Sequence, residues 1–328
     1  MLYWAVIGSG DVVSRLVKNS FDIPGKSSVK YIYSKKYDEA KKISLKYKLG
    51  KPVKNIQLII NDNQINSIYI ATTPDSHAHY TKMFAKLKKN ILCEKPLALN
   101  LKDINEIKKL CSKNKINLVT SFYRRHLKRF KFIKDILNKK KIGKIVYFNY
   151  SLIHSPKSHP TAPIKSMNFS KLPWRFKKSI SGGGNFLDMG AHAIDMIMYL
   201  LGDIRQMHSL KRNYLKLYNV EDTLITNIEL KNNLVGQAVW SSVTNLKSDK
   251  FEIFGTNGTI KFSLNFSDKV EILTNNKKIT KNISFEKPFH KNIIHQTINI
   301  FLKNKKIGKY FIDRAGIDVA KHQINAIN

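Results

Sequence analysis

The chain is poor in cysteine, in acidic residues and in long apolar runs. Only two of its 328 residues are cysteines, Cys93 and Cys111, and they lack the spacing of metal ligands. This excludes a disulfide framework and suits a reducing compartment, so we expect a cytoplasmic protein. No run reaches the roughly 18 apolar residues that cross a bilayer, and the first residues lack the basic region and cleavage site of a secretory leader. We therefore expect no membrane partner.

The scarcity of acids leaves a formal net charge of +35, from 58 lysines and arginines against 23 aspartates and glutamates. Such a charge raises the possibility of a nucleic-acid partner, because clustered cations bind phosphates. Here the lysines are spread from Lys18 to Lys321, without a zinc-finger, basic-zipper or RNA-binding signature. Solvated helix faces explain most of them, so nucleic-acid binding is the weaker alternative. Because basic residues are so frequent in this chain, a lysine at a motif position is only weak evidence for a functional role.

Strand-like and helix-like patterns alternate over residues 1–121. Apolar runs predict strands at residues 2–7, 29–33, 67–71, 90–93 and 117–121, and helical periodicity predicts helices at residues 11–18, 38–49, 77–88 and 101–114. A turn is predicted at residues 72–75. This alternation predicts an α/β fold, a doubly wound parallel sheet of Rossmann type that forms a dinucleotide-binding domain.

The pattern changes over residues 122–328. A helix at 130–139 and a strand at 145–153 precede a loop rich in proline, serine and histidine, then a glycine run that opens an apolar helix at 184–201. Alternating runs at 222–230, 234–243, 250–255, 259–264 and 270–274 predict strands, and helices are predicted at 293–303 and 315–327. We expect a second α/β domain with an open, mostly antiparallel sheet, which binds substrate and mediates oligomerisation. Its last helix is able to pack back on the first domain.

Gly8-Ser9-Gly10 stands between the first predicted strand and helix. Missing side chains there let the backbone approach a pyrophosphate, so we predict cofactor contacts at Gly8, Gly10, Asp11 and Val12. The third glycine of the motif is replaced by Val13, and a tight turn without a ligand is the alternative. After the second strand, Ser34 and Lys35 stand where an NAD site has an acid, which favours NADP over NAD.

Three further motifs carry polar side chains that need an explanation. Glu94-Lys95-Pro96 follows a strand at the edge where such sheets bind ligands, and a surface turn is the alternative. Trp174-Arg175 offers an aromatic wall and a cation for a substrate. The alternative is a Trp174 indole packed in the core beside a solvated Arg175 guanidinium. Asp188, His192 and Asp195 fall on one face of the apolar helix, where a cleft is favoured over satisfied core polar groups.

Together these motifs resemble the family of glucose-fructose oxidoreductase, inositol dehydrogenase and rhizopine-catabolism proteins (Gfo/Idh/MocA), which are NAD(P)-dependent oxidoreductases. The similar segments are residues 5–10, 71–74 with His77, 93–98, 124–143, 174–175, 182–202 and 255–258. The resemblance covers residues 2 to about 260. It implies a Rossmann domain followed by an α/β domain whose open sheet often packs face to face, and hence a homodimer or homotetramer.

The resemblance also implies a set of site residues. The catalytic set maps onto Lys95, Asp188 and His192, and the peptide bond before Pro96 is expected to be cis. The cofactor set adds Ser34, Lys35, Thr72, Thr73, Pro74, His77, Glu94 and Lys95 to the glycine turn. The substrate set is Lys95, Arg124, Trp174, Arg175, Asp188 and His192. No metal is expected.

The implied reaction is hydride transfer between a nicotinamide and a carbinol or carbonyl carbon of a sugar, cyclitol, sugar derivative or dihydrodiol. We expect His192 to exchange the hydroxyl proton, Lys95 to hydrogen-bond the same oxygen, Asp188 to orient substrate or imidazole, and Asp195 to support them. The loop at 154–176, with His154, His159, Lys165 and Arg175, is expected to line the pocket and leans toward an anionic sugar. The alternatives are a glycosidase-type enzyme that uses bound NAD as a transient oxidant, and a non-catalytic nucleotide-binding or regulatory protein.

Overall fold

The computed structural model describes residues 1–16, 20–158, 172–274, 277–283, 291–306 and 309–328. It divides into two compact units. The first unit is Met1–Tyr123 with Lys287–Ala320, and the second unit is Arg124–Glu286 with Lys321–Asn328. Within the described part of the chain, no helix is long and apolar enough to cross a membrane.

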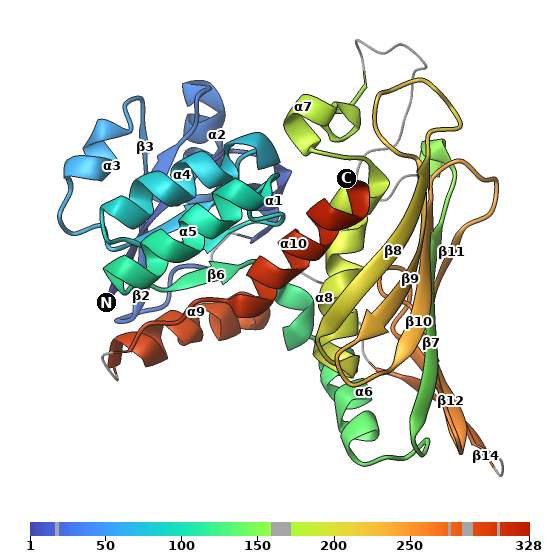
Figure 1. Ribbon diagram of the computed structural model, residues 1–328. Helices are drawn as coiled ribbons and strands as arrows, with labels where there is room; N and C mark the ends of the chain where they lie inside the picture. The colour runs from blue at the N-terminus through green and yellow to red at the C-terminus, as the bar shows by residue number, and fades with distance from the viewer. Residues whose placement is uncertain (17–19, 159–171, 275–276, 284–290, 307–308) are drawn as a thin grey trace. The chain divides into compact units, whose positions relative to one another are not determined.

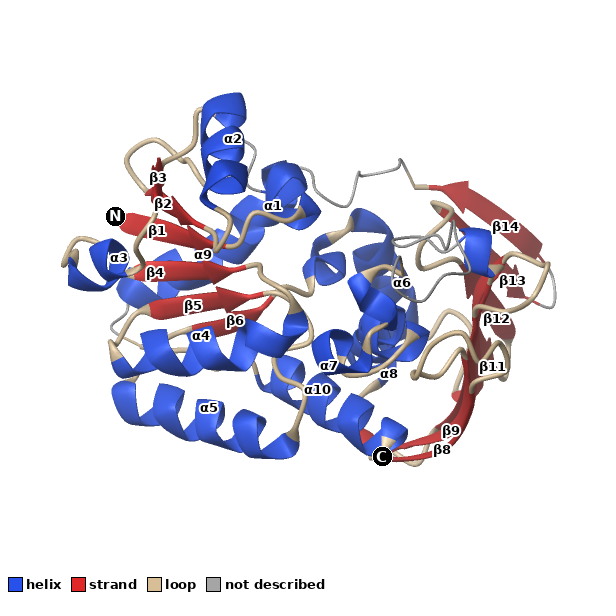
Figure 2. Ribbon diagram, turned by 90° about the horizontal axis from the view of Figure 1, so that it is seen from above, coloured by secondary structure: helices blue, strands red, loops and turns tan. Residues whose placement is uncertain are grey.

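The first unit contains a six-stranded parallel sheet. Its strands are β1 (Leu2–Ile7), β2 (Ser27–Tyr33), β3 (Lys51–Val53), β4 (Ser67–Ile70), β5 (Asn90–Cys93) and β6 (Leu118–Thr120), in the order β3-β2-β1-β4-β5-β6 (Figure 2). The chain moves outward from β1 to β3 and then returns to the other side of β1 at β4. That reversal is the point where doubly wound sheets bind dinucleotides, and it confirms the predicted Rossmann architecture.

The helices of the first unit follow the strands. They are α1 (Asp11–Leu16), α2 (Tyr37–Tyr47), α3 (Gln57–Asn61), α4 (Pro74–Lys86), α5 (Leu101–Asn114) and α9 (Lys291–Lys306). The turn predicted at 72–75 is shorter than expected, because Pro74 is already the first residue of α4 and Thr73 is its N-cap. Proline is favoured at that position since the missing N–H would have no helical acceptor.

A buried tryptophan organises the core of the first unit. The indole of Trp4 contacts Phe21 and Phe301 edge-on, with ring centroids 5.2 and 5.3 Å apart, and its Nε1 donates to Ser27 Oγ at 2.9 Å. Phe301 belongs to α9, whose Ile294 and Ile298 join the same core. A segment near the end of the chain thus completes the sheet unit formed by its beginning.

The second unit contains an eight-stranded sheet. Its strands are β7 (Ile145–Ile153), β8 (Ile204–Arg212), β9 (Thr223–Leu230), β10 (Val235–Ser241), β11 (Ser248–Gly255), β12 (Gly258–Phe262), β13 (Lys269–Thr274) and β14 (Lys277–Asn282). They lie in the order β14-β13-β12-β11-β7-β10-β9-β8, and only the β7–β10 pair is parallel. The predicted, mostly antiparallel sheet is confirmed.

Helices cover one face of this sheet, as Figure 1 shows for α6 (Lys128–Asn138) and α8 (Ala191–Leu201). A π-helical turn (Phe186–Gly190) leads into α8 and packs on β10, where the rings of Phe186 and Trp240 lie 4.8 Å apart. The short helices η4 (Trp174–Phe176) and α7 (Lys178–Ser181) precede that turn, and α10 (Arg314–Ile327) runs through residues of both units.

The opposite face of the sheet carries exposed apolar side chains. Leu210 on β8 is 69% exposed, and its cross-strand partner Ile225 on β9 is 46% exposed. Val235 on β10, which lies on the same face as Ile225, is also about half exposed. Among the described elements, none covers Leu210, Ile225 and Val235, which we call the outer apolar face.

Candidate active site

The β1–α1 turn is built for close approach of another backbone. Gly8 has a φ of +120°, and a Cβ there would lie 2.4 Å from the carbonyl oxygen of Ala71, so only glycine fits. Its N–H donates to Tyr33 O at 2.8 Å, which joins the ends of β1 and β2. A Cβ at Gly10, by contrast, would meet no atom within 4 Å. The turn therefore leaves its second glycine open to a ligand, as binding of a dinucleotide pyrophosphate requires.

His77 connects two of the predicted cofactor loops. Its Nδ1 lies 2.7 Å from Pro96 O and its Nε2 lies 3.1 Å from Thr72 O. The ring is buried at 1% exposure, and burial lowers the pKa of the imidazole, against the raising effect of the two carbonyls. A neutral imidazole has one N–H, so it donates to one carbonyl at a time. His77 thus positions the Thr72 turn against the segment that carries Lys95, and direct contact between His77 and a cofactor stays a prediction.

Glu94 and Lys95 occupy the end of β5, as the sequence indicated. The peptide bond between Lys95 and Pro96 is cis. Tyr69 OH donates to Glu94 Oε1 at 2.9 Å, and burial raises the pKa of this carboxyl group, partly offset by that hydrogen bond. Glu94 is therefore tied to β4, while Lys95 is half-buried beside it.

The glycine run of the second unit depends on a residue that the sequence did not single out. A Cβ at Gly184 would lie 1.9 Å from Glu221 O, and the N–H of Gly184 donates to Glu221 Oε1 at 2.8 Å. Burial raises the pKa of Glu221, and the Gly184 N–H opposes that rise. Glu221 lies just before β9, so its contact with the glycine run is a long-range one that no local pattern reveals.

Three predicted substrate residues come together next to this run. Arg175 Nε donates to Asp188 Oδ2 at 2.9 Å, and the guanidinium lies 4.3 Å from the centroid of the Trp174 ring. Asp188 is only 11% exposed in its side chain, so the pair is partly shielded from water. The Arg175 cation is therefore matched by a carboxylate and stacked on an indole.

The helix that carries His192 differs from the sequence prediction. Asp188 lies in the π-helical turn, where the spacing of a regular α-helix does not hold, and ten of the eleven residues of α8 are buried. His192 is 7% exposed and Asp195 is 1% exposed. Asp195 accepts from Arg125 Nε at 2.8 Å, so its charge is satisfied inside the unit. The polar face predicted for this helix is therefore mostly buried within the second unit, and its place in a cleft stays a prediction.

Arg124 and His154 have structural contacts. The guanidinium of Arg124 donates to Leu264 O at 3.1 Å and to Asn265 Oδ1 at 2.7 Å. His154 is fully buried, with Nδ1 3.0 Å from Ser155 O, and burial lowers the pKa of its ring. Substrate contacts at both residues stay predictions. His159 and Lys165 lie outside the described residues.

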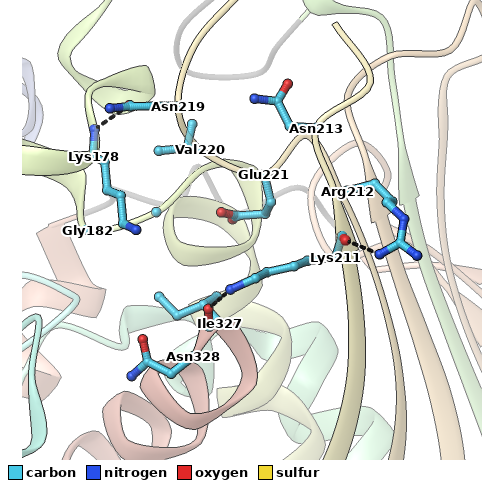
Figure 3. A pocket seen from close by; sticks show the side chains of 11 residues that line it. Lys178, Gly182, Lys211, Arg212, Asn213, Asn219, Val220, Glu221, Ile327 and Asn328 are labelled. Carbon is cyan, nitrogen blue, oxygen red and sulfur yellow. Dashed lines mark hydrogen bonds between the residues drawn. The ribbon is translucent and has the colours of Figure 1, made fainter. Parts of the chain in front are cut away.

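A pocket of about 370 Å³ adjoins the glycine run at Gly182 and Gly183. Figure 3 shows Lys178, Lys211 and Arg212 around it, with Glu221 between them. Lys211 Nζ donates to Ile327 O, so this ammonium group is already hydrogen-bonded to the backbone of α10. None of the predicted site residues lines the pocket, and it is separate from the group formed by Trp174, Arg175 and Asp188.

The first sheet, its reversal at β1 and the open glycine turn define a dinucleotide-binding protein of the Rossmann class. Residues 2–122 match the family model described as the oxidoreductase family with an NAD-binding Rossmann fold, and residues 130–261 match the GFO/IDH/MocA C-terminal domain. The chain belongs to the GFO/IDH/MocA family, and it is an NAD(P)-dependent oxidoreductase. The predictions of family and of enzyme class are confirmed.

Individual relatives are distant. The chain is 24% identical to Oxidoreductase P35 of Formosa agariphila over 91% of this chain and 90% of that protein. It is 26% identical to the myo-inositol 2-dehydrogenase of Thermotoga maritima over 81% and 77% of the two chains. Its fold is similar to levoglucosan dehydrogenase in complex with NADH and levoglucosan, with a TM-score of 0.82, 22% identity and coverage of 99% and 96%. It is also similar to a 3-ketoreductase from Actinomadura kijaniata in complex with NADP and TDP-benzene, with a TM-score of 0.81, 18% identity and the same coverage.

The buried ion pair between Arg125 and Asp195 gives a prediction for stability. Arg125→Met leaves the Asp195 carboxylate buried without this cation, which typically costs about 3–5 kcal/mol. The matched control is Lys139→Met, which breaks an exposed pair with Asp135 and costs at most about 1 kcal/mol. Calorimetric unfolding checks both variants. Equal melting temperatures for the two would contradict a stabilising role for the buried pair.

The environment of His77 gives a prediction for pH dependence. Its folded pKa lies below its unfolded value, so the unfolded chain binds more protons once the pH falls below about 6.5. His77 therefore lowers the free energy of unfolding as the pH drops, by up to about 1.4 kcal/mol per pH unit. We expect His77→Gln to lose less stability than wild type between neutral and acidic pH in urea titrations.

The control for this titration is His79→Gln, because His79 is exposed on α4. Glu94 and Glu221 have raised pKa values and act in the opposite direction in all three proteins, so the comparison isolates the imidazole. If His77→Gln and His79→Gln show the same pH dependence, the buried neutral state of His77 is wrong.

Proposed function

We propose that the protein transfers a hydride between NAD(P) and a carbinol or carbonyl carbon of a neutral polyhydroxy compound: a sugar, cyclitol, sugar derivative or dihydrodiol. The first unit supplies the dinucleotide site and the second unit supplies the substrate site. The observation that carries the proposal is the group of Trp174, Arg175 and Asp188, held together just before the helix of His192. An indole with hydrogen-bonding charged groups is what recognition of a ring with hydroxyl groups requires.

Three side chains have proposed chemical roles. The nicotinamide, when bound, accepts or returns the hydride at C4. His192 removes the proton of the substrate hydroxyl in the oxidative direction and returns it in the reverse direction, and such acid–base help is typically worth about 10²–10⁴-fold in rate. Lys95 donates a hydrogen bond to the same oxygen and stabilises developing negative charge. Asp188 accepts a hydrogen bond from substrate or imidazole and is oriented by Arg175.

The neutral substrate follows from the ion pair between Arg175 and Asp188. The basic residues of the loop at 154–176 suggested an anionic sugar, but the Arg175 cation is already compensated by a carboxylate 2.9 Å away. An anionic group would have to compete with Asp188 for this guanidinium. A hydroxyl, by contrast, donates to the carboxylate or accepts from the guanidinium without displacing either.

The predicted homo-oligomer has a candidate surface in the outer apolar face. Leu210 and Ile225 lie opposite each other on adjacent strands. Contact with a partner subunit would remove their exposed apolar surface from water and so stabilise the assembly. Because a twofold dimer uses the same patch on both subunits, we propose that two outer apolar faces pack together.

Substitution of the outer face tests this assembly. Ile225→Lys places a cation in the middle of the patch, and we expect it to shift the protein toward monomer in sedimentation equilibrium. Leu45→Lys is the matched control, since Leu45 is 70% exposed on α2 and belongs to the first unit. A monomeric wild-type protein, or a dimer that survives Ile225→Lys, would remove the outer apolar face as the interface.

Enzymatic function is tested by two active-site variants assayed with a panel of neutral sugars, cyclitols, sugar acids and dihydrodiols. We expect wild type to form reduced nicotinamide in proportion to product, measured by absorbance. His192→Ala and Lys95→Ala each lose at least about 100-fold in kcat, because each removes a group that acts on the reacting oxygen.

Thermal stabilisation by NAD(H) and NADP(H) is the control for these variants, and we expect His192→Ala to keep it. Turnover that is unchanged in either variant would remove that residue from the catalytic set. Glycoside cleavage without net formation of reduced cofactor would favour the transient-oxidant reaction. Cofactor binding without turnover of any substrate would favour a regulatory protein.

A further inference from the structure

The end of β2 is the part of a dinucleotide site that distinguishes NAD from NADP. An acidic side chain there hydrogen-bonds the ribose 2′-hydroxyl of NAD, whereas cations accommodate the 2′-phosphate of NADP. In this chain β2 ends at Tyr33 and is followed by Ser34, Lys35 and Lys36, with no acid. Local sequence therefore points to NADP.

The structure brings an acid to the same place from the next helix. Glu39, in the first turn of α2, accepts from Ser9 Oγ through Oε2 at 2.8 Å. Ser9 is the central residue of the glycine turn, and its hydroxyl also lies 2.8 Å from Ser34 Oγ. A hydroxyl carries one proton, so when Ser9 donates to Glu39, Ser34 donates to Ser9. Glu39 thus contacts the glycine turn directly, and only the Ser9 hydroxyl separates it from Ser34 in the loop after β2. These two loops border the adenosine ribose in this fold.

The balance of charge around Glu39 is set by its neighbours. The hydrogen bond from Ser9 is the main cause that lowers the pKa of Glu39, with a further contribution from Lys36, so the side chain is ionised at neutral pH. Lys36 Nζ lies 3.3 Å from Glu39 Oε1. This pairing engages Lys36. Among the described residues, the Glu39 carboxylate is in contact with Ser9 and Lys36, and not with Lys35, the lysine on which the expectation of NADP rested.

We propose that Glu39 is the residue that selects the cofactor, and that it selects NAD over NADP. The carboxylate accepts a hydrogen bond from the ribose 2′-hydroxyl, in the place of the one it accepts from Ser9. A 2′-phosphate carries close to two negative charges and no proton to donate at neutral pH, so it is repelled by Glu39. The proposal rests on the proposed NAD(P)-dependent function and concerns the same site.

Binding of NADH and NADPH to the full-length protein, measured by calorimetric titration at low ionic strength, tests the proposal without any turnover. We expect wild type to bind NADH more tightly than NADPH. Glu39→Gln keeps the shape of the side chain but removes its charge, so we expect the ratio of the two dissociation constants to shift toward NADPH by about tenfold. Low salt is required because charges at this exposed position are screened.

Asp38→Asn is the matched control. Asp38 lies one residue earlier in the same helical turn and is exposed, so the substitution changes the net charge by the same amount. We expect its ratio of dissociation constants to stay at the wild-type value. A general effect of protein charge would shift both variants equally and would overturn the assignment to Glu39.

The outcomes separate this proposal from the one on which it rests. If wild type binds neither dinucleotide, the proposed NAD(P)-dependent function itself fails. If wild type binds both but prefers NADPH, or if Glu39→Gln leaves the ratio unchanged, the function stands and the role of Glu39 is overturned. Lys36→Ala adds an independent check, because it removes the cation paired with Glu39 and should strengthen the preference for NADH.

Discussion

The close approach of Gly8 to the end of β4 is the constraint on which the rest of the first unit depends. It is possible only without a side chain, since a Cβ would lie 2.4 Å from Ala71 O. From this contact a continuous line of interactions runs along the edge of the sheet. On one side Gly8 bonds to Tyr33 at the end of β2, and on the other Thr72 connects through His77 to Pro96. These contacts position the end of β2 and the segment of Lys95 relative to each other within the first unit.

In the second unit, a glycine again allows a close contact between two backbone segments. Gly184 allows the glycine run to lie against Glu221, and its N–H satisfies that buried carboxyl group. The run then enters a π-helical turn rather than a regular helix, and this turn presents Asp188 to Arg175. Asp188 and Asp195 are each paired with an arginine, since a buried carboxylate left unpaired would cost several kcal/mol.

Regular elements with strong periodicity could be predicted from the sequence. The helix at Leu101–Asn114 and the strand at Ile145–Ile153 have the predicted bounds, because burial on one face imposes a period that survives in the sequence. The strands β3 and β8 were not predicted. The first has three residues, and the second is an exposed, charged edge strand whose side chains carry little alternation. The role of α9 in the core of the first unit was also hidden, since the contact of Phe301 with Trp4 joins residues far apart in the chain.

The amino-acid sequence by itself indicated the class of protein, because glycines stand where the backbone makes close contacts and the combined motifs resemble those of one enzyme family. It marked the glycine turn, the segment of Lys95 and the helix of His192. Only the tertiary structure decided which charges meet. Glu39 reaches Ser9 from another element, Glu221 reaches Gly184, and Arg175 is neutralised by Asp188. Two polar or charged groups interact strongly only when they lie close together in space. Residues that are separated in the sequence become neighbours only when the chain folds.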